Sequence, residues 1–485
     1  MKKGDTLELE ITRYAAEGKG IAKINRNIIK PAQDIEQQDK NEENYVVFVR
    51  GAYPGDKVTA QLRKIKKSYA EAVIDKIISP SEDRVEPRCK YFGTCGGCKQ
   101  QDLDYNTQLK FKQELVKETF EHIAGLKDFE FEEIIPSESN FFYRNKMEYS
   151  FADKRWLTKE EIGSENIVDK EFALGLHIPR IFDKVLDINE CFLQSEISNE
   201  ILNYTRTFFK DKNVSIYSTK THTGYLRNLA IRQSQNKDDL MVNLVTSIED
   251  DDLMKEYTSE MLRLIPQITT VINNINTKKA SVAIGDYEKV YHGEGFIYDK
   301  IGNYDFRISA NSFFQTNTVQ AENLYKTAME FAELKGDEII YDLYSGAGTI
   351  AIYVSGKAKK VIGFESIRSA IRDAAENAIL NNTENVQFAE ANLYKSFLPI
   401  VEQNNIPKPD VVIIDPPRSG MHKTTVDDVI QLNPKKIVYV SCNPASQARD
   451  IKLMVEAGYK LQKMKPVDMF PHTYHIENVA LLLKS

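Results

Sequence analysis

Five cysteines are the residues of this chain that most directly suggest chemistry. Cys89, Cys95 and Cys98 form a CxxxxxCxxC cluster whose second pair encloses two glycines, and Cys191 can supply a fourth thiolate. Four thiolates suit either zinc or an iron–sulfur cluster, and the uneven three-plus-one spacing favours [4Fe-4S]. Scattered structural thiols are the plain alternative. Cys442 remains outside this set, so we interpret it as a candidate nucleophile.

A second set of candidate residues lies where apolar, strand-like runs end. Asp342 ends one such run and is followed by a GxG turn, Gly346 to Gly348, whose glycines let a ligand approach the backbone closely. Glu365 ends the next run, where a carboxylate can accept hydrogen bonds from both hydroxyls of a ribose. A third glycine, typical of dinucleotide sites, is missing, and acidic residues including Asp415 suit a cationic ligand. We therefore expect S-adenosylmethionine rather than NAD, although a plain tight turn would also explain the two glycines.

Cys442 follows the apolar run 437–441 and precedes an Asn-Pro turn and a helical pattern. A thiol in that position lies near a helix amino end, which would lower its pKa. A thiolate can add to carbon 6 of a pyrimidine and make carbon 5 nucleophilic, after which a base must remove the carbon 5 proton. Glu477 is the predicted base, with His472 and His475 as alternatives. An inert buried cysteine and a glutamate at a strand edge are the plain interpretations.

The size and composition of the chain predict a cytoplasmic protein of several domains. Its 485 residues exceed the usual size of a single core, and 42% of them are hydrophobic. No apolar stretch is long enough to span a membrane, and the first residues lack the apolar block of a signal peptide. In a reducing compartment an odd number of cysteines with CxxC spacing indicates metal binding or catalysis rather than disulfides.

The formal net charge of −7 argues weakly against a polyanionic partner, but the basic residues are clustered. Arg63–Lys67 holds four of them, Arg144 and Lys146 stand close together, and Arg227 and Arg232 form a further pair. We interpret these clusters as candidate RNA contacts, with a solvated charged surface as the alternative.

The pattern of residues 1–80 predicts a small β-barrel. Short alternating runs at 6–12, 45–50, 57–62 and 69–74 are separated by glycine turns. The polar run 34–44 interrupts this pattern and cannot contribute to a core.

The rest of the chain predicts a central α+β region, 81–310, and a C-terminal α/β region, 311–485. The central region contains a helical pattern at 109–123 and strand patterns at 141–151, 214–218 and 240–245. The C-terminal region alternates strands and helices, which indicates a doubly wound parallel sheet. Its predicted parallel strands are 339–343, 361–365, 386–389, 411–414 and 437–441. No helix separates the last two strands, 459–465 and 477–483, so the final strand should run antiparallel. That direction would place Glu477 at the carboxyl ends of the parallel strands, where ligands of such sheets bind.

On these residues and motifs the chain resembles the S-adenosylmethionine-dependent RNA uracil-5-methyltransferases, specifically their iron–sulfur branch with a TRAM domain. The resemblance covers nearly the whole length and implies a multidomain α/β protein. Its parts would be an N-terminal OB-like barrel (1–80), a central α+β iron–sulfur domain (81–310) and a Rossmann-like methyltransferase domain with an antiparallel last strand (311–485). It also implies the site residues. Cofactor contacts would come from Gln315, Tyr344, Glu365 and Asp415, the cluster ligands would be Cys89, Cys95, Cys98 and Cys191, the nucleophile Cys442 and the base Glu477.

The resemblance further implies the substrate, a uridine of 23S ribosomal RNA that must be flipped out of the folded RNA into the site. We expect no membrane partner and a monomer. Phe141, Phe142 and Tyr143 could stack on bases or belong to the core. Methylation of a tRNA uridine, methylation of cytosine, and a catalytically idle iron–sulfur RNA-binding factor are the alternatives. The chain departs from the family pattern in its acidic insert and in Asn392, where related folds often carry aspartate.

Overall fold

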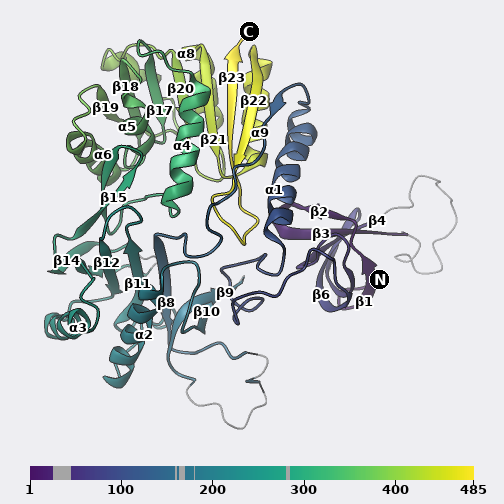
Figure 1. The fold of residues 1–485 in the computed structure, drawn as a ribbon, viewed down its shortest axis with the longest axis vertical. Helices are drawn as coiled ribbons and strands as arrows, with labels where there is room; N and C mark the ends of the chain where they lie inside the picture. Colours follow the sequence, from purple (N-terminus) through teal and green to yellow (C-terminus); the bar gives the residue numbers. More distant parts are fainter. Residues whose placement is uncertain (26–44, 159–160, 163–169, 180, 280–283) are drawn as a thin grey trace. The chain divides into compact units, whose positions relative to one another are not determined.

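A computed structural model describes residues 1–25, 45–158, 161–162, 170–179, 181–279 and 284–485 (Figure 1). The chain divides into two compact units. The first comprises Met1–Phe92, Cys98–Glu118 and Phe470–His475, and the second Gly93–Gly97, Thr119–Met469 and Ile476–Ser485. The division into three domains at residues 80 and 310 stays a prediction. The polar insert 34–44 lies outside the described residues.

The first unit contains a six-stranded sheet in which buried and exposed residues alternate. Its strands are β1 (Thr6–Glu10), β2 (Arg13–Ala15), β3 (Lys19–Ile24), β4 (Tyr45–Arg50), β5 (Lys57–Ile65) and β6 (Tyr69–Ser79), in the order β1-β5-β6-β4-β3-β2. Strand β1 also packs against β3. Along β5 the buried side chains are Val58, Ala60 and Leu62, every second residue, as the sequence pattern predicts.

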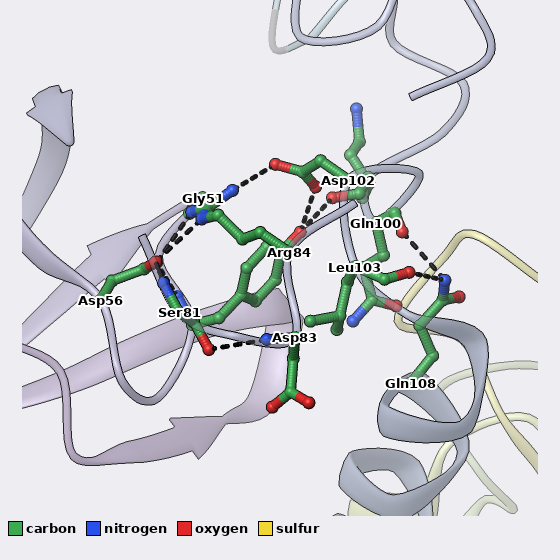
Figure 2. A network of polar contacts seen from close by, with 11 residues as sticks. Gly51, Asp56, Ser81, Asp83, Arg84, Gln100, Asp102, Leu103 and Gln108 are labelled. Carbon is green, nitrogen blue, oxygen red and sulfur yellow. Dashed lines mark hydrogen bonds and ion pairs between the residues drawn. The ribbon is translucent and has the colours of Figure 1, made fainter. Parts of the chain in front are cut away.

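A polar network joins this sheet to the segment that follows it (Figure 2). The Arg84 guanidinium donates to both oxygens of the buried Asp56 carboxylate at 2.8 Å and also pairs with Asp102. The Tyr53 hydroxyl donates to Asp102 at 2.6 Å, and the Arg84 guanidinium lies 4.5 Å from the centre of the Tyr53 ring. The buried carboxylate is therefore paired and fully hydrogen-bonded.

Helix α1 (Tyr105–Thr119) begins four residues before the predicted start at 109, because Asp104 caps it. The Asp104 carboxylate accepts a hydrogen bond from the Thr107 amide at 3.1 Å, which satisfies one of the donors at the helix start. The helix runs into a π-helical turn, η3 (Phe120–Ala124), and Gly125 ends it with φ +72°.

The second unit contains a seven-stranded mixed sheet in its central region. The strands are β8 (Lys146–Ala152), β9 (Ala173–Ile178), β10 (Ile181–Asp187), β11 (Leu226–Gln233), β12 (Leu240–Thr246), β13 (Thr270–Ile275) and β14 (Tyr287–His292), in the order β10-β9-β8-β11-β12-β13-β14. Helices α2 (Glu196–Asp211) and α3 (Asp251–Leu264) pack against each other, and β15 (Phe296–Ile301) pairs with β16 (Tyr304–Ser309).

Two predicted strands of this region are corrected. The run 214–218 forms only a single bridge, between Ile216 and Leu226, because the chain reverses directly after it through Gly224 at φ +110°. The run 141–151 becomes a strand only from Lys146 onwards. Before it, Phe141 and Phe142 meet Phe192 edge to face, so these aromatics pack within the protein.

The C-terminal region forms a further sheet of this unit (Figure 1, green to yellow). Its strands are β17 (Ile339–Leu343), β18 (Lys360–Glu365), β19 (Val386–Glu390), β20 (Val411–Ile414), β21 (Lys436–Ser441), β22 (Tyr459–Val467) and β23 (Glu477–Lys484), in the order β19-β18-β17-β20-β21-β23-β22-β7. Strands β17 to β21 are parallel and β23 runs antiparallel to β21, which confirms the predicted reversal. The short β7 (Glu130–Phe131) adds an edge strand that no sequence pattern indicated.

Helix α4 (Thr318–Ala332) precedes β17. The helices that connect the following strands are α5 (Thr349–Ser355), α6 (Arg368–Leu380), α7 (Leu398–Gln403), α8 (Lys423–Leu432) and α9 (Pro444–Glu456). Helices α4, α5 and α6 pack in a row, and α8 packs on α9. Because crossover connections are right-handed and the strand order reverses between β17 and β20, the two sets cover opposite faces. Within the described part of the chain, no helix is long and apolar enough to cross a bilayer.

Candidate active site

The strand order places a binding crevice between β17 and β20. Ligands of open α/β sheets bind beside the carboxyl ends of the strands at the point where the order reverses. The residues that follow these two strands line one cavity there, together with the loop before α4. Among the residues in its wall are Phe313, Phe314, Gln315, Tyr325, Asp342, Tyr344, Ser345, Gly346 and Asp415. Three of the four predicted cofactor contacts, Gln315, Tyr344 and Asp415, therefore meet in one place.

The turn after β17 is shaped by Glu365 and two glycines. The Glu365 carboxylate accepts hydrogen bonds from the amides of Gly346 at 3.0 Å and Ile367 at 2.9 Å, so it is held against the turn. Gly348 has φ +79°, and a Cβ there would lie 2.6 Å from the Phe388 ring. The glycine is therefore required by both conformation and space.

Asp342 is fully buried beneath this turn. One carboxylate oxygen accepts a hydrogen bond from the Ala351 amide at 3.0 Å, whereas the other is buried without a hydrogen-bond partner among the described residues. Burial, reinforced by the Asp415 carboxylate, raises the pKa of Asp342 well above its usual range. The buried Ser345 hydroxyl also lacks a hydrogen-bond partner in the described structure. Two unsatisfied acceptors beside a cavity suit a polar, cationic ligand.

Cys442 and Glu477 are brought together by the antiparallel strand. Ser441, the last residue of β21, pairs with Asn478 of β23. Cys442, which follows β21, and Glu477, the first residue of β23, are therefore opposite each other at the strand ends. Asp415 follows the neighbouring β20, and both carboxylates act electrostatically on the Cys442 thiol. The predicted convergence of these three residues at one edge is observed.

The electrostatics of the Cys442 thiol differ from the prediction. Burial, followed by the Glu477 and Asp415 carboxylates, raises the pKa of Cys442 to about 11, and Arg418 and a backbone hydrogen bond offset only part of this. The expected lowering by the start of α9 is therefore wrong in this state, because two nearby acidic groups and desolvation outweigh a helix end.

The pKa values of the Asp415 and Glu477 carboxyl groups are both raised. Burial raises the pKa of Asp415 to about 7. The pKa of Glu477 lies well above its usual range because the side chain is buried and faces Asp415, although Arg418 partly offsets this. A carboxylate with a raised pKa is a stronger base than one in water, so Glu477 is suited to accept a proton from carbon.

Asn443 fixes the loop that carries the thiol. Its side chain accepts a hydrogen bond from the Ala445 amide at 3.1 Å, which caps α9, and donates to the Arg418 carbonyl at 2.8 Å. The loops after β20 and β21 are thereby tied together. Sequence reasoning missed Arg418, although its place directly after the Asp-Pro-Pro segment was a usable signal.

The four other cysteines fall on both compact units, Cys89 and Cys98 on the first and Cys95 and Cys191 on the second. Among the described residues, no group of three or more His, Cys, Asp or Glu side chains is arranged to hold a metal ion. Two of the thiols nevertheless accept N–H donors. The Gly97 amide lies 3.3 Å from the sulfur of Cys95, and the Gln101 side-chain amide lies 3.2 Å from that of Cys98.

Gly96 allows this loop to run against β9. Its amide donates to the His177 carbonyl at 2.9 Å, and a Cβ at this position would lie 2.3 Å from the same oxygen. Cys95 and Cys191 both act on the buried Tyr149 hydroxyl, whose pKa is raised first by burial and then by these thiols. The N–H donors beside the sulfurs of Cys95 and Cys98 are contacts of the kind that thiolates accept.

Of the predicted basic clusters, Arg227 and Arg232 are buried. Arg227 donates to the Asn276 carbonyl at 2.8 Å, and Arg232 donates to the Ser312 carbonyl. Burial lowers the pKa of Arg232 to about 10. Both guanidiniums therefore support the backbone as well as contributing positive charge. A cavity of about 550 Å³ lies beside Arg232, and its wall includes Lys146, Phe313 and Phe314. Burial and Arg232 lower the pKa of Lys146, so positive charge is concentrated there.

Comparison with known proteins identifies the family. The profile described as tRNA (Uracil-5-)-methyltransferase matches residues 234–485, more than half of the chain. The chain belongs to this methyltransferase family. A TRAM domain profile matches residues 1–74, which confirms the predicted OB-like barrel. The chain is therefore an S-adenosylmethionine-dependent RNA uracil-C5-methyltransferase, as its motifs predicted.

Relatives match this chain over nearly its whole length. An uncharacterized RNA methyltransferase of Chlorobaculum tepidum is 41% identical over 99% of this chain and 96% of its own. One of Bacteroides thetaiotaomicron is 42% identical over 96% of this chain and 99% of its own. The crystal structure of the Pyrococcus abyssi tRNA (uracil-54, C5)-methyltransferase in complex with S-adenosyl-L-homocysteine is 28% identical. It aligns with a TM-score of 0.73 and covers 98% of this chain and 100% of its own.

Proposed function

We propose that this enzyme methylates carbon 5 of a uridine in 23S ribosomal RNA, with Cys442 as nucleophile and Glu477 as base. The observation that carries the proposal is the pairing of Ser441 with Asn478, which sets the thiol and the carboxylate opposite each other at the ligand-binding edge. Family membership supplies the reaction class, and this geometry supports the proposed roles of Cys442 and Glu477.

Gln315, Tyr344, Glu365 and Asp415 are proposed to hold S-adenosylmethionine. One Glu365 oxygen, Oε1, accepts hydrogen bonds from the Ser366 and Ile367 amides and the Ser366 hydroxyl, whereas Oε2 accepts only from the Gly346 amide. The remaining acceptor capacity of Oε2 suits a ribose hydroxyl. The unsatisfied oxygen of Asp342 and the Asp415 carboxyl group would face a cationic sulfonium, and that cation would favour the ionised forms of both groups, whose pKa values burial raises. When bound, this cofactor supplies the methyl group and leaves as a neutral thioether.

The residues of the chain then perform two steps, an addition and a later elimination. The Cys442 thiolate adds to carbon 6 of the uracil, which moves the carbon 5–carbon 6 π electrons towards the carbon 4 oxygen and makes carbon 5 a nucleophile. After carbon 5 has gained the methyl group, Glu477 removes the carbon 5 proton. The electron pair of that bond restores the double bond, and the carbon–sulfur bond breaks to release the thiolate.

RNA is proposed to reach the site as a flipped-out base held by surrounding cations. The cavity beside Arg232 shares Phe313 and Phe314 with the cofactor cavity, and Lys146 lies in its wall. The exposed basic residues of Arg63–Lys67 on the barrel would contact phosphates. We propose that the enzyme acts as a monomer.

We also propose that Cys89, Cys95, Cys98 and Cys191 hold a [4Fe-4S] cluster. N–H donors to the sulfurs of Cys95 and Cys98 support this, because such contacts stabilise cluster thiolates. After anaerobic purification the wild type should show visible absorbance with iron and sulfide, Cys95→Ser should lose all three, and the control Cys442→Ser should retain them. Colourless, iron-free wild type, or zinc in its place, would contradict the cluster.

Transfer RNA is the second candidate substrate. The solved Pyrococcus abyssi enzyme covers 98% of this chain, and its name gives tRNA as its substrate. An enzyme that aligns with nearly the whole of this chain therefore has tRNA in its name, so the overall layout of the chain does not discriminate between the two RNAs.

The test is to incubate wild type, Cys442→Ala and Glu477→Gln with S-adenosylmethionine and either unmodified 23S RNA or total tRNA. Nucleosides are then analysed by mass spectrometry, and protein–RNA adducts by denaturing electrophoresis. We expect 5-methyluridine in 23S RNA from wild type, no product from Cys442→Ala, and a stable adduct with Glu477→Gln. Product only in tRNA would change the substrate, 5-methylcytidine would change the base, and no product in either RNA would favour an idle domain.

A further inference from the structure

The loop between β22 and β23 leads directly into the proposed base. Its residues Phe470–His475 belong to the first compact unit, whereas Ile476 and β23 belong to the second. The segment that precedes Glu477 is thus in contact with residues that lie far away in the sequence.

Gln108 of α1 holds this loop at His472. The Gln108 side chain is fully buried, and its carbonyl oxygen accepts a hydrogen bond from the His472 amide at 2.9 Å. Its side-chain nitrogen donates to the carbonyls of Gln100 at 2.9 Å and Leu103 at 2.8 Å, as Figure 2 shows, and lies 3.3 Å from Nδ1 of His472. One amide therefore links α1, the segment after Cys98 and the loop.

The loop has further anchors from the same unit. The His472 carbonyl accepts hydrogen bonds from the amides of Lys99 at 2.8 Å and Gln100 at 3.0 Å. The ammonium of the buried Lys112 donates to the Phe470 carbonyl at 3.1 Å. The backbone amide and carbonyl of His472 are thus both fixed by residues 99–108.

The conformation at His472 needs such anchors. Its φ is +62°, a left-handed conformation that is less favourable for a residue with a Cβ and that the surrounding contacts help to maintain. If the anchors are lost, the backbone can relax to negative φ, and the path of the chain into β23 changes. Glu477 is the first residue of that strand.

We propose that Gln108 is a positioning residue for the reaction, which fixes His472 and thereby the approach of Glu477 to the carbon 5 proton. This inference rests on the proposed function. The step affected is the last one, in which the proton passes to Glu477, its electron pair forms the carbon 5–carbon 6 double bond, and carbon 6 releases the Cys442 thiolate. Addition of the thiol and methyl transfer do not require that base.

The test compares Gln108→Met with wild type and Glu477→Gln. Methionine keeps the volume of the side chain but removes its hydrogen bonds. The matched control is Thr205→Val, which removes the buried 2.7 Å hydrogen bond to the Tyr257 hydroxyl in the second unit. We expect Gln108→Met to lower kcat on the order of 10- to 100-fold with unchanged KM, because small displacements of a reacting group have effects of this size.

The distinguishing readout is the covalent adduct. With Gln108→Met the methylated protein–RNA adduct should accumulate as it does with Glu477→Gln, and amide exchange of the peptide 470–480 should speed up. Thr205→Val should do neither. Parallel loss of adduct and product, or a kcat equal to wild type, would overturn the proposal. If Gln108→Met does not fold, Lys112→Met carries the same test. Absence of adduct and 5-methyluridine with wild type and Glu477→Gln would instead refute the proposed function.

Discussion

Removing the Arg84 side chain should destabilise the first compact unit, called the barrel unit below, far more than removing an exposed arginine. Asp56 is fully buried and paired with Arg84 through two hydrogen bonds of 2.8 Å (Figure 2). In Arg84→Ala this carboxylate stays buried without its cation. Two backbone donors remain, the amides of Tyr53 at 2.7 Å and Ser81 at 2.8 Å, so part of the stabilisation is kept.

The magnitude follows from these contacts. Breaking a buried ion pair by removing one partner costs about 3–5 kcal/mol, and the retained amides favour the lower end. Tyr53 also loses the guanidinium over its ring, which contributes about 0.5–2 kcal/mol. We therefore expect Arg84→Ala to lower the free energy of unfolding of the barrel unit by about 4 kcal/mol. This corresponds to a roughly thousand-fold increase in local opening.

Hydrogen exchange measured by mass spectrometry can follow this opening in β5 and β6 of the full chain. The matched control is Arg13→Ala, since Arg13 pairs with Glu118 on the surface and exposed pairs contribute at most about 1 kcal/mol. The single tryptophan, Trp156, lies in the second unit, so its fluorescence reports whether the effect stays local. Equal exchange in the two variants would refute the reasoning.

Three further changes test the candidate site. Burial raises the pKa of Asp415 to about 7, so wild type loses stability as the pH rises from about 4 through 7 and the buried carboxyl group ionises. Asp415→Asn cannot ionise, so its free energy of unfolding should exceed that of wild type increasingly across this range, by at most about 4 kcal/mol. Calorimetry at several pH values measures this difference. The rate of Cys442 alkylation should rise with pH around a pKa near 11. Cationic S-adenosylmethionine should lower this pKa more than neutral S-adenosylhomocysteine does. Glu477→Gln should also lower it, because the substitution removes a nearby carboxylate. Gly348→Ala should weaken S-adenosylmethionine binding at least tenfold in calorimetric titration, because the added Cβ would lie 2.6 Å from Phe388.

Local signals were sufficient for most of the C-terminal sheet. Val411–Ile414 is buried throughout, as a strand covered on both faces requires, and its apolar run predicted it. The antiparallel last strand followed from the missing helix before it, and this placed Glu477 beside Cys442. These inferences needed only neighbouring residues and the rules of strand connection.

Contacts between residues that lie far apart in the sequence could not be predicted from local patterns. Arg227 and Arg232 look like RNA contacts in the sequence, yet carbonyl groups from distant loops hold both inside the protein. The partner of Gln108 is His472, 364 residues away, and nothing in either local pattern joins them. Asn392 uses its side chain to accept from the Tyr394 amide at 3.0 Å, a local turn that its sequence position does not predict.

The pKa of the Cys442 thiol depends on distances in the fold that the spacing of residues in the sequence does not give. A helix start favours a thiolate, and the sequence places one directly after Cys442. The fold, however, also delivers Asp415 and Glu477 to the same edge and desolvates all three groups, and these effects raise the pKa of the thiol. Buried carboxyl groups of raised pKa destabilise the protein above neutral pH, so they are costly to keep without a cationic partner. The positive sulfonium of S-adenosylmethionine would offset that cost. It would also offset the repulsion between the two carboxylates and the Cys442 thiolate, so the thiolate should form most readily when the methyl donor is bound.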